Sequence, residues 1–294
     1  MWLFRLLGPL RAERDGLEVP VGTPQARAVL AMLAWRANEV VSIDRLSDEL
    51  WGCSPPASSH TQVHAIISRL RRLLGRDRIA TARPGYLLRA SPPELEIDLF
   101  HDEVSRARLL VAADEVESGA GRLRAALARW RGPALAELRS ACHAAQGLDE
   151  FRVVVLEDRI DADLRLGRGR DLVGELTELV AEHPLRERPR AQLMRALAGA
   201  GRVADALRAY AALRGDLVRE LGVEPSLELR TLHTRILRGE PVVVRPGDAP
   251  RPAARPPRQG QTRSEVTRLR SSGSRLPSNP DATRKISLLN PPAS

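Results

Sequence analysis

The side chains best suited to recognition chemistry lie in the segment from residue 58 to residue 75. Apolar residues recur there at every third or fourth position, as on a helix with one buried stripe: Val63, Ile66, Ile67, Leu70, Leu73 and Leu74. The other positions include hydroxyl, imidazole and guanidinium groups: Thr61, His64, Ser68, Arg69, Arg71 and Arg72. Small hydroxyl residues allow close approach to DNA base edges, and a guanidinium can bind O6 and N7 of guanine. This face predicts contact with double-stranded DNA.

Within that face, the arginines are expected to contact different parts of the DNA. Arg69 is expected at a base edge, whereas Arg71 and Arg72, one turn later, are better placed for phosphates. A solvated basic helix is the alternative, and it would be preferred if the run Ser68–Arg72 stood alone. The choice therefore depends on the elements that surround the helix.

Catalytic chemistry is poorly represented. The six histidines are scattered, without a metal-ligand spacing. One segment does concentrate carboxylates, but arginines are interleaved with them, which favours ion pairing on a helix surface: Glu157, Asp158, Arg159, Asp161, Asp163 and Arg165. Cys142 and His143 are adjacent, but neighbours in sequence rarely form a catalytic dyad. We expect no enzymatic activity, no catalytic residue, no metal and no cofactor.

The basic residues also exclude some functions. Lys285 is the only lysine, and the other 45 of the 46 basic residues are arginines. A phosphate-binding loop that ends in Gly-Lys-Ser/Thr and a Schiff-base lysine are therefore not expected in a folded core. A GC-rich genome explains most of this bias. Its physical consequence is that the cations of the core region are planar forks, which can bind phosphate or guanine in bidentate fashion.

Charge divides the chain into three segments. Residues 1–93 carry a net charge of +5, residues 94–240 carry −3, and residues 241–294 carry +7. The last segment is rich in proline and arginine and has no apolar period, so we expect a disordered, solvated tail. Loose attraction of this tail to nucleic acid is the alternative. We expect domains at 1–93 and 94–240, followed by the tail.

The first segment has the order of a winged helix-turn-helix. Short apolar runs at 2–7 and 17–21 predict a small antiparallel sheet, and three helices follow at about 23–37, 42–51 and 58–75. A β-hairpin is predicted from residues 79–81 and 86–88, joined by a type II turn at Arg83-Pro84-Gly85. Arg83 is a candidate for the minor groove or a phosphate, or is an ordinary exposed turn residue. Tyr86 is expected to pack under the hairpin.

The second segment is predicted to be helical and repetitive. Gly167-Arg168 and Gly201-Arg202 lie 34 residues apart and are followed by similar patterns. Thirty-four residues is the period of the tetratricopeptide helix pair. Further helices are predicted at 122–130 and 151–166, and Pro225 is expected to open a last one through Leu237. The fold class is therefore mainly α: a winged helix followed by an all-α, tetratricopeptide-like domain.

The chain resembles the Streptomyces antibiotic regulatory protein family, in which an OmpR-type winged helix precedes a bacterial transcriptional activation domain. Short runs carry the resemblance: Phe4–Leu10, Val41–Leu46, Leu50–Gly52, Ser68–Gly75 and Pro84–Leu88, then Trp130–Leu135, Leu156–Leu164, His183–Arg188 and Leu221–Pro225. The resemblance covers about residues 1–240.

The resemblance implies an activator of secondary-metabolite genes, such as antibiotic biosynthesis genes. Such a protein binds direct repeats near promoters, often as a head-to-tail pair, and recruits RNA polymerase. By position, the family's recognition-helix and wing contacts match Thr61, Ser68, Arg69, Arg71 and Arg83. There is neither a receiver domain before the winged helix nor an ATPase module after residue 240, so we expect a small form of the regulator.

Three further expectations complete the reading. The start of the chain has no signal-peptide pattern and no run is long enough to span a membrane, so a cytoplasmic protein without a membrane partner is expected. Gly119 and Gly121 predict a loosely formed first helical repeat. The alternatives to an activator are a repressor of the same fold and a helical-repeat scaffold whose winged helix binds protein.

Overall fold

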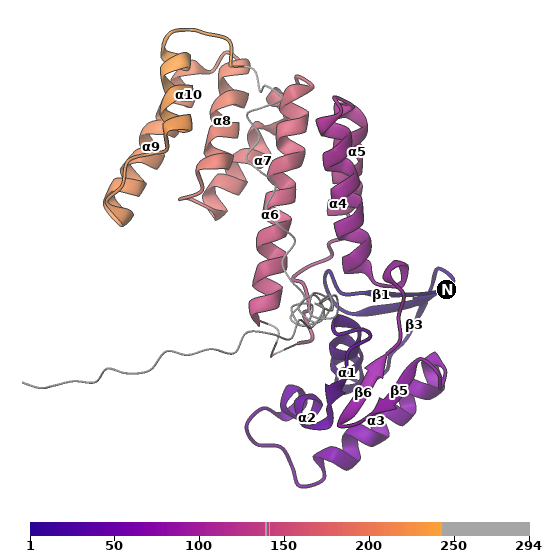
Figure 1. The fold of residues 1–294 in the computed structure, drawn as a ribbon. Helices are drawn as coiled ribbons and strands as arrows, with labels where there is room; N and C mark the ends of the chain where they lie inside the picture. The colour runs from indigo at the N-terminus through magenta and orange to yellow at the C-terminus, as the bar shows by residue number, and fades with distance from the viewer. Residues whose placement is uncertain (139, 141, 243–294) are drawn as a thin grey trace, which may run out of the picture. The chain divides into compact units, whose positions relative to one another are not determined.

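The N-terminal part of the chain contains two small antiparallel sheets and three helices. The computed structural model describes residues 1–138, 140 and 142–242 (Figure 1). The first sheet consists of β1 (Trp2–Arg5), β2 (Arg11–Arg14) and β3 (Leu17–Val19), in that order. The helices are α1 (Pro24–Trp35), α2 (Ile43–Trp51) and α3 (Ser59–Leu74). The second sheet has the order β4-β6-β5 and consists of β4 (Val41–Ser42), β5 (Ile79–Ala82) and β6 (Gly85–Leu88).

Local sequence signals explain where these helices begin. The side chain of Thr23 accepts a hydrogen bond from the backbone N–H of Ala26, and Pro24 occupies the first turn of α1. Ser42 caps α2 in the same way, through the N–H of Arg45. These elements confirm the predicted winged helix. Strand β2 was not predicted, because only Ala12 of its four residues is buried and it shows no apolar alternation.

The turn of the β5–β6 hairpin differs from the prediction. Ala82 pairs with Gly85, so the turn consists of Arg83 and Pro84 alone, and the peptide bond between them is cis. The expected type II turn is wrong, because Gly85 belongs to β6 and has no positive φ. Gly85 serves a steric purpose instead: a Cβ there would lie 1.9 Å from the carbonyl oxygen of Val41. Only glycine lets β4 pair this closely with β6.

A series of helices follows the winged helix. After a short 3₁₀ turn (Pro92–Glu94), the helices are α4 (Glu96–Ala112), α5 (Val116–Leu127), α6 (Cys142–Arg165), α7 (Gly169–Glu182), α8 (Glu187–Gly199), α9 (Val203–Leu221) and α10 (Leu227–Leu237). The pairs α7–α8 and α9–α10 begin 34 residues apart, which confirms the helical repeat. Ser226 caps α10, so Pro225 precedes the cap and does not open the helix. From residue 243 onward, the expected tail lies outside the described residues.

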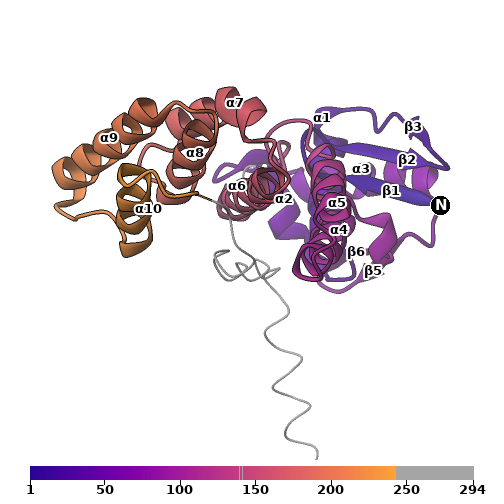
Figure 2. The same ribbon diagram turned by 90° about the horizontal axis from the view of Figure 1, so that it is seen from above.

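The first helix pair is not loose at Gly119. This residue is buried, and a Cβ on it would lie 2.4 Å from a methyl group of Val111 and 3.0 Å from the carbonyl oxygen of Ala107. The glycine therefore allows α5 to lie directly against α4, and both views show the two helices side by side (Figures 1 and 2). The prediction was wrong because intrinsic helix propensity takes no account of interhelical contact. Gly121 meets no atom within 4 Å and stands on the open side.

The apolar core is continuous across residue 93. One cluster joins β1, α1 and α3 to α4, α5 and the first half of α6, and a second cluster fills α6 to α10. The carboxylate of Glu96 is fully buried at this junction. It accepts hydrogen bonds from the backbone N–H groups of Leu6 and Leu7 at 2.9 and 3.0 Å, and from Arg131 at 2.9 Å. The segment that follows β1 is thus hydrogen-bonded to α4 as well as packed against it.

Candidate nucleic-acid interface

Helix α3 has the two faces that its sequence pattern predicts. The apolar stripe is buried: Val63, Ile66, Ile67, Leu70 and Leu74. Only Leu73 of that stripe is partly exposed. The opposite side is open to solvent over its whole length: Thr61, His64, Ala65, Ser68, Arg69 and Arg72. The exposed face therefore combines small, hydroxyl and guanidinium side chains, as close contact with a DNA groove requires.

Two arginines of this face have charges that no other described residue neutralises. Arg69 and Arg72 are exposed and form no ion pair with any described residue. Arg83, in the hairpin turn, is also exposed and unpaired within that same part of the chain. An unpaired guanidinium keeps all five N–H donors for an incoming phosphate or base. These three side chains are therefore the available cations of the predicted site.

Arg71 has a different environment from its neighbours. Its Nε donates to the carbonyl oxygen of Ile79 at 2.9 Å, and its Nη2 donates to Oγ1 of Thr81 at 2.7 Å. Its Cζ also lies 5.3 Å from the ring centroid of Tyr86, within cation–π range. The structure therefore joins Arg71 to the hairpin, although the sequence pattern suggested a phosphate contact.

His64 and Ser68 also have partners within the domain. A ring nitrogen of His64 forms a short hydrogen bond with the hydroxyl of Tyr86, which is 6% exposed and packs under the hairpin as expected. The hydroxyl of Ser68 donates to the carbonyl oxygen of His64 at 2.9 Å and keeps its acceptor lone pairs. Thr61 forms no described hydrogen bond through its side chain and stands free at the start of the face.

Two further arginines near α3 contrast with each other. Arg76, directly after the helix, is exposed and unpaired among the described residues, and it could have been identified from its position next to Gly75. Arg78 instead forms a two-point ion pair with Glu94, at 2.9 and 2.7 Å. Burial by itself would raise the pKa of Glu94, but hydrogen bonds from Arg78 and Ser91 outweigh it and hold that pKa at about 2. Both terminal nitrogens of Arg78 are therefore already engaged, and Arg78 is not counted among the available cations.

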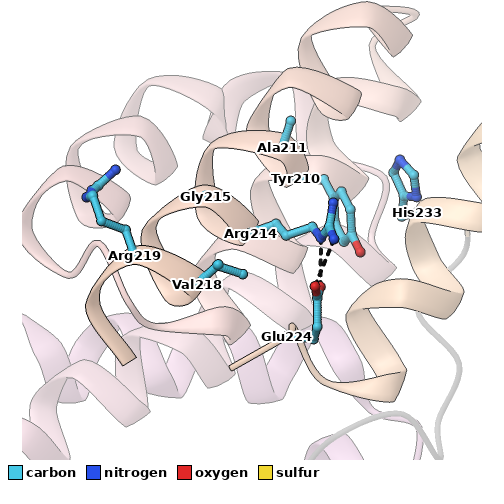
Figure 3. A pocket seen from close by; sticks show the side chains of 8 residues that line it. All are labelled: Tyr210, Ala211, Arg214, Gly215, Val218, Arg219, Glu224 and His233. Carbon is cyan, nitrogen blue, oxygen red and sulfur yellow. Dashed lines mark hydrogen bonds and ion pairs between the residues drawn. The ribbon is translucent and has the colours of Figure 1, made fainter. Parts of the chain in front are cut away.

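The helical region has a pocket of its own, with a volume of about 560 Å³, between α9 and α10 (Figure 3). Arg214 donates to Glu224 across its mouth at 2.7 and 2.8 Å. The rings of Tyr210 and His233 stack with centroids 3.9 Å apart, and burial lowers the pKa of His233. No group of three or more potential metal ligands occurs among the described residues. Nothing in this lining resembles a nucleophile with its base.

A comparison with the preceding repeat explains the pocket. Thirty-four residues before Arg214 and Arg219 stand Val180 and Leu185, which pack in the second core cluster. Polar side chains have thus replaced apolar ones in the last described helix pair. The pocket lacks a catalytic constellation among the described residues, and the interface on α3 is the better candidate site.

Among the described residues, every helix is too short or too polar to span a lipid bilayer.

Comparison with known proteins identifies both parts of the chain. Residues 18–88 match the family described as transcriptional regulatory protein, C terminal, and residues 95–237 match the bacterial transcriptional activator domain. The regulatory protein DnrI of Streptomyces peucetius is 38% identical over 258 residues, which cover 83% of this chain and 95% of DnrI. The regulatory protein AfsR of Streptomyces griseus is also 38% identical, over 85% of this chain but only 26% of AfsR.

A solved structure shows the same architecture. Mycobacterium tuberculosis EmbR, in complex with a low-affinity phosphopeptide, superposes with a TM-score of 0.76 at 36% sequence identity. The match covers 83% of this chain and 66% of the EmbR chain. This chain therefore spans most of DnrI, about two thirds of EmbR and about a quarter of AfsR.

Proposed function

Because the chain belongs to the Streptomyces antibiotic regulatory protein family of transcriptional regulators, in which an OmpR-type winged helix is joined to a bacterial transcriptional activation domain, we propose that it is a sequence-specific, DNA-binding activator. Its targets in this proposal are genes of a secondary-metabolite pathway, such as antibiotic biosynthesis. The observation that carries the proposal is the exposed face of α3, on which Arg69 and Arg72 have no ion-pair partner among the described residues.

The proposed contacts follow from the chemistry of that face. Thr61, Ser68 and Arg69 read base edges in the major groove, and Arg72 binds a phosphate. Arg83 in the hairpin turn reaches the minor groove or the adjacent phosphates. His64 and Arg71 lie on the same side of the domain, and their contacts with the hairpin are consistent with a place between helix and wing.

The helical region provides the second half of the proposal. Residues 1–93 act as the reader, and residues 94–240 make the contacts that bring RNA polymerase to the promoter. In this proposal, two copies bind head to tail on direct repeats. The proposal includes no enzymatic step, no cofactor and no metal.

Binding measurements over a range of salt concentrations test the reader. The DNA probes are the promoter regions of neighbouring genes and a scrambled sequence of the same length and composition. We expect tighter binding to one promoter and a steep loss of affinity with salt for both probes, because phosphate contacts release counterions from any sequence. Equal binding of promoter and scrambled DNA by the wild-type protein would contradict the proposal.

The sign of regulation requires a separate assay. In-vitro transcription from the footprinted promoter is expected to rise when the protein is added to RNA polymerase. A fall in transcript, with footprinting intact, would replace the activator by a repressor of the same fold. Absence of any DNA footprint, with a folded protein, would favour the helical-repeat scaffold.

A further inference from the structure

One set of contacts fixes the hairpin, hereafter the wing (residues 79–88), to α3. Figure 1 shows β5 and β6 beside that helix. From α3, Arg71 donates to two groups of β5: the carbonyl oxygen of Ile79 at 2.9 Å and the hydroxyl of Thr81 at 2.7 Å. His64, two helical turns earlier, bonds the hydroxyl of Tyr86 on β6. Each strand of the wing is therefore held by a different residue of the same helix.

Guanidinium geometry suits this task. Its N–H groups lie in one plane in a rigid fork, so that a single side chain can hold two acceptors at fixed positions. The Cζ atom of the same guanidinium lies over the ring of Tyr86, 5.3 Å from the ring centroid. A lysine ammonium at this position would keep the charge but not the fork, and it would bind the two acceptors without a fixed orientation.

The turn between the two strands carries Arg83. Since Ala82 pairs with Gly85, only Arg83 and Pro84 lie outside the strand ladder. The position of Arg83 relative to α3 is consequently set by how β5 and β6 are fixed to the helix. Arg72, the next residue after Arg71, is exposed and unpaired within the described region, so it provides a control of the same charge at almost the same place.

From these contacts we infer that Arg71 is a positioning residue, which holds the wing against α3 so that Arg83 and the exposed face of the helix engage DNA as one surface. This inference rests on the proposed function and deepens it. It assigns Arg71 a role through the wing, whereas a phosphate contact alone would make Arg71 equivalent to Arg72.

Conservative substitutions separate the two roles. Arg71→Lys is expected to weaken binding to the promoter roughly tenfold. A loss of this size is within the range of coupling energies between residues that share one hydrogen-bond network. Arg72→Lys should weaken binding clearly less than Arg71→Lys, because the ammonium keeps the charge that a phosphate contact depends on. In the Arg83→Ala background, Arg71→Lys should cost little further affinity, since the wing contact that it positions is already lost. Strict additivity of the two substitutions would contradict the inference.

The salt dependence gives a second discriminating result. Arg72→Ala should reduce the slope of log K against log salt by about 0.9, the value for one phosphate contact. Arg71→Lys keeps its charge, so its affinity should fall at every salt concentration with a nearly unchanged slope. Wild-type affinity for Arg71→Lys, together with the slope change of a phosphate contact for Arg71→Ala, would overturn the positioning role.

A measurement without DNA keeps the inference testable whatever the DNA result. Backbone amides of β5 and β6 should exchange hydrogen faster in Arg71→Lys than in Arg72→Lys, because local opening of the wing becomes easier. Thr81→Val, which removes one acceptor and keeps the shape of the side chain, should produce a smaller change in the same amides. Wild-type exchange rates for the β5 and β6 amides in both Arg71→Lys and Thr81→Val would overturn the inference. Failure of the wild type to discriminate DNA would instead overturn the proposed function.

Discussion

Arginine performs opposite tasks in the winged helix and in the helical region. On α3, Arg69 and Arg72 are exposed and have no acidic partner in the described structure. On α8, Arg188 is only 19% exposed and forms ion pairs with three carboxylates of α6, those of Glu157, Asp158 and Asp161. The residue type is the same, but one set of charges is unpaired among the described residues and the other joins α8 to α6.

This contrast suggests a criterion: unpaired charges, more than the number of charges, mark the proposed binding surface. Most described arginines between residues 94 and 240 form ion pairs, and that segment carries a net charge of −3. The segment 1–93 has fewer basic residues but carries +5. Arg69, Arg72 and Arg83, which lack ion-pair partners among the described residues, contribute to this excess, and in the proposed function their field attracts phosphate.

The largest effect is expected from Arg188→Ala. Removal of this guanidinium leaves Asp161 without an ion-pair partner among the described residues, whereas Glu157 keeps Arg186 and Asp158 keeps Arg108. The free energy of unfolding should therefore fall by about 3 kcal/mol, the lower end of the cost of breaking a buried ion pair. Denaturant unfolding measures it. Arg195→Ala, on the same helix and without an ion pair in the described structure, is the matched control and should cost far less. An equal loss of unfolding free energy in Arg188→Ala and Arg195→Ala would show that the ion pairs of Arg188 contribute nothing beyond the packing of its side chain.

The next largest effect depends on pH and involves the ion pair between Arg78 and Glu94. Glu94 has a pKa of about 2 in the folded protein, against an ordinary value of 4.5. A lowered folded-state pKa contributes stability above the unfolded value, and that contribution is lost as pH falls from about 4.5 to 2. At neutral pH, Glu94→Gln should lose about 2 kcal/mol, less than the full pKa difference implies, because Arg78 is 31% exposed and solvent screens the pair. The difference between wild type and variant should shrink in unfolding curves between pH 5 and pH 2; a constant difference would exclude the ion pair as its cause.

A smaller effect, on specificity and not on stability, is expected from Arg69→Ala. If Arg69 reads one base pair, the variant should lose about 1–3 kcal/mol of discrimination at that position and keep its preference elsewhere in the site. Competition binding with single-base variants of the promoter measures this. Thermal unfolding should be unchanged, because Arg69 has no described partner to lose. A uniform loss over all sequences would reassign Arg69 to the phosphates.

The smallest effect is expected at an exposed ion pair of the helical region. Arg106 and Asp102 are paired at 2.8 Å along one face of α4, with side chains 62% and 55% exposed. Arg106→Ala should change the free energy of unfolding by only about 0.3 kcal/mol, since exposed pairs four residues apart contribute little. A loss as large as that of Arg188→Ala would show that exposure does not separate structural from solvated pairs in this protein.

Local patterns predicted the elements of this fold well. The stripe from Val63 to Leu70, the caps at Thr23 and Ser42, and the 34-residue spacing all depend on neighbours within a few residues or on repetition. Each can therefore be recognised in the sequence alone. The exposed side of α3 was predicted by the same helical period, and its role in binding DNA stays a prediction.

Contacts between distant residues were beyond the sequence patterns. Nothing near Arg71 shows that Thr81 will accept its hydrogen bond, because the register of the wing against α3 is a tertiary property. Gly119 was interpreted by helix propensity, but its position opposite Ala107 and Val111 decides its role. Gly85 was assigned to a turn, although the close approach of β4 is what requires it.

The buried carboxylate of Glu96 has a consequence for how this architecture can be rearranged by recombination. Glu96 lies after the winged helix in sequence, yet its carboxylate accepts hydrogen bonds from the backbone N–H groups of Leu6 and Leu7. The same carboxylate also accepts a hydrogen bond from Arg131, which comes later in the chain. A winged helix transferred to another protein without Glu96 would leave two buried amides unsatisfied, a cost of about 1–3 kcal/mol for each. Gene fusions that succeed should therefore exchange residues 1–93 together with α4 and the segment after α5 that carries Arg131. The inherited unit is then larger than the proposed DNA-binding domain.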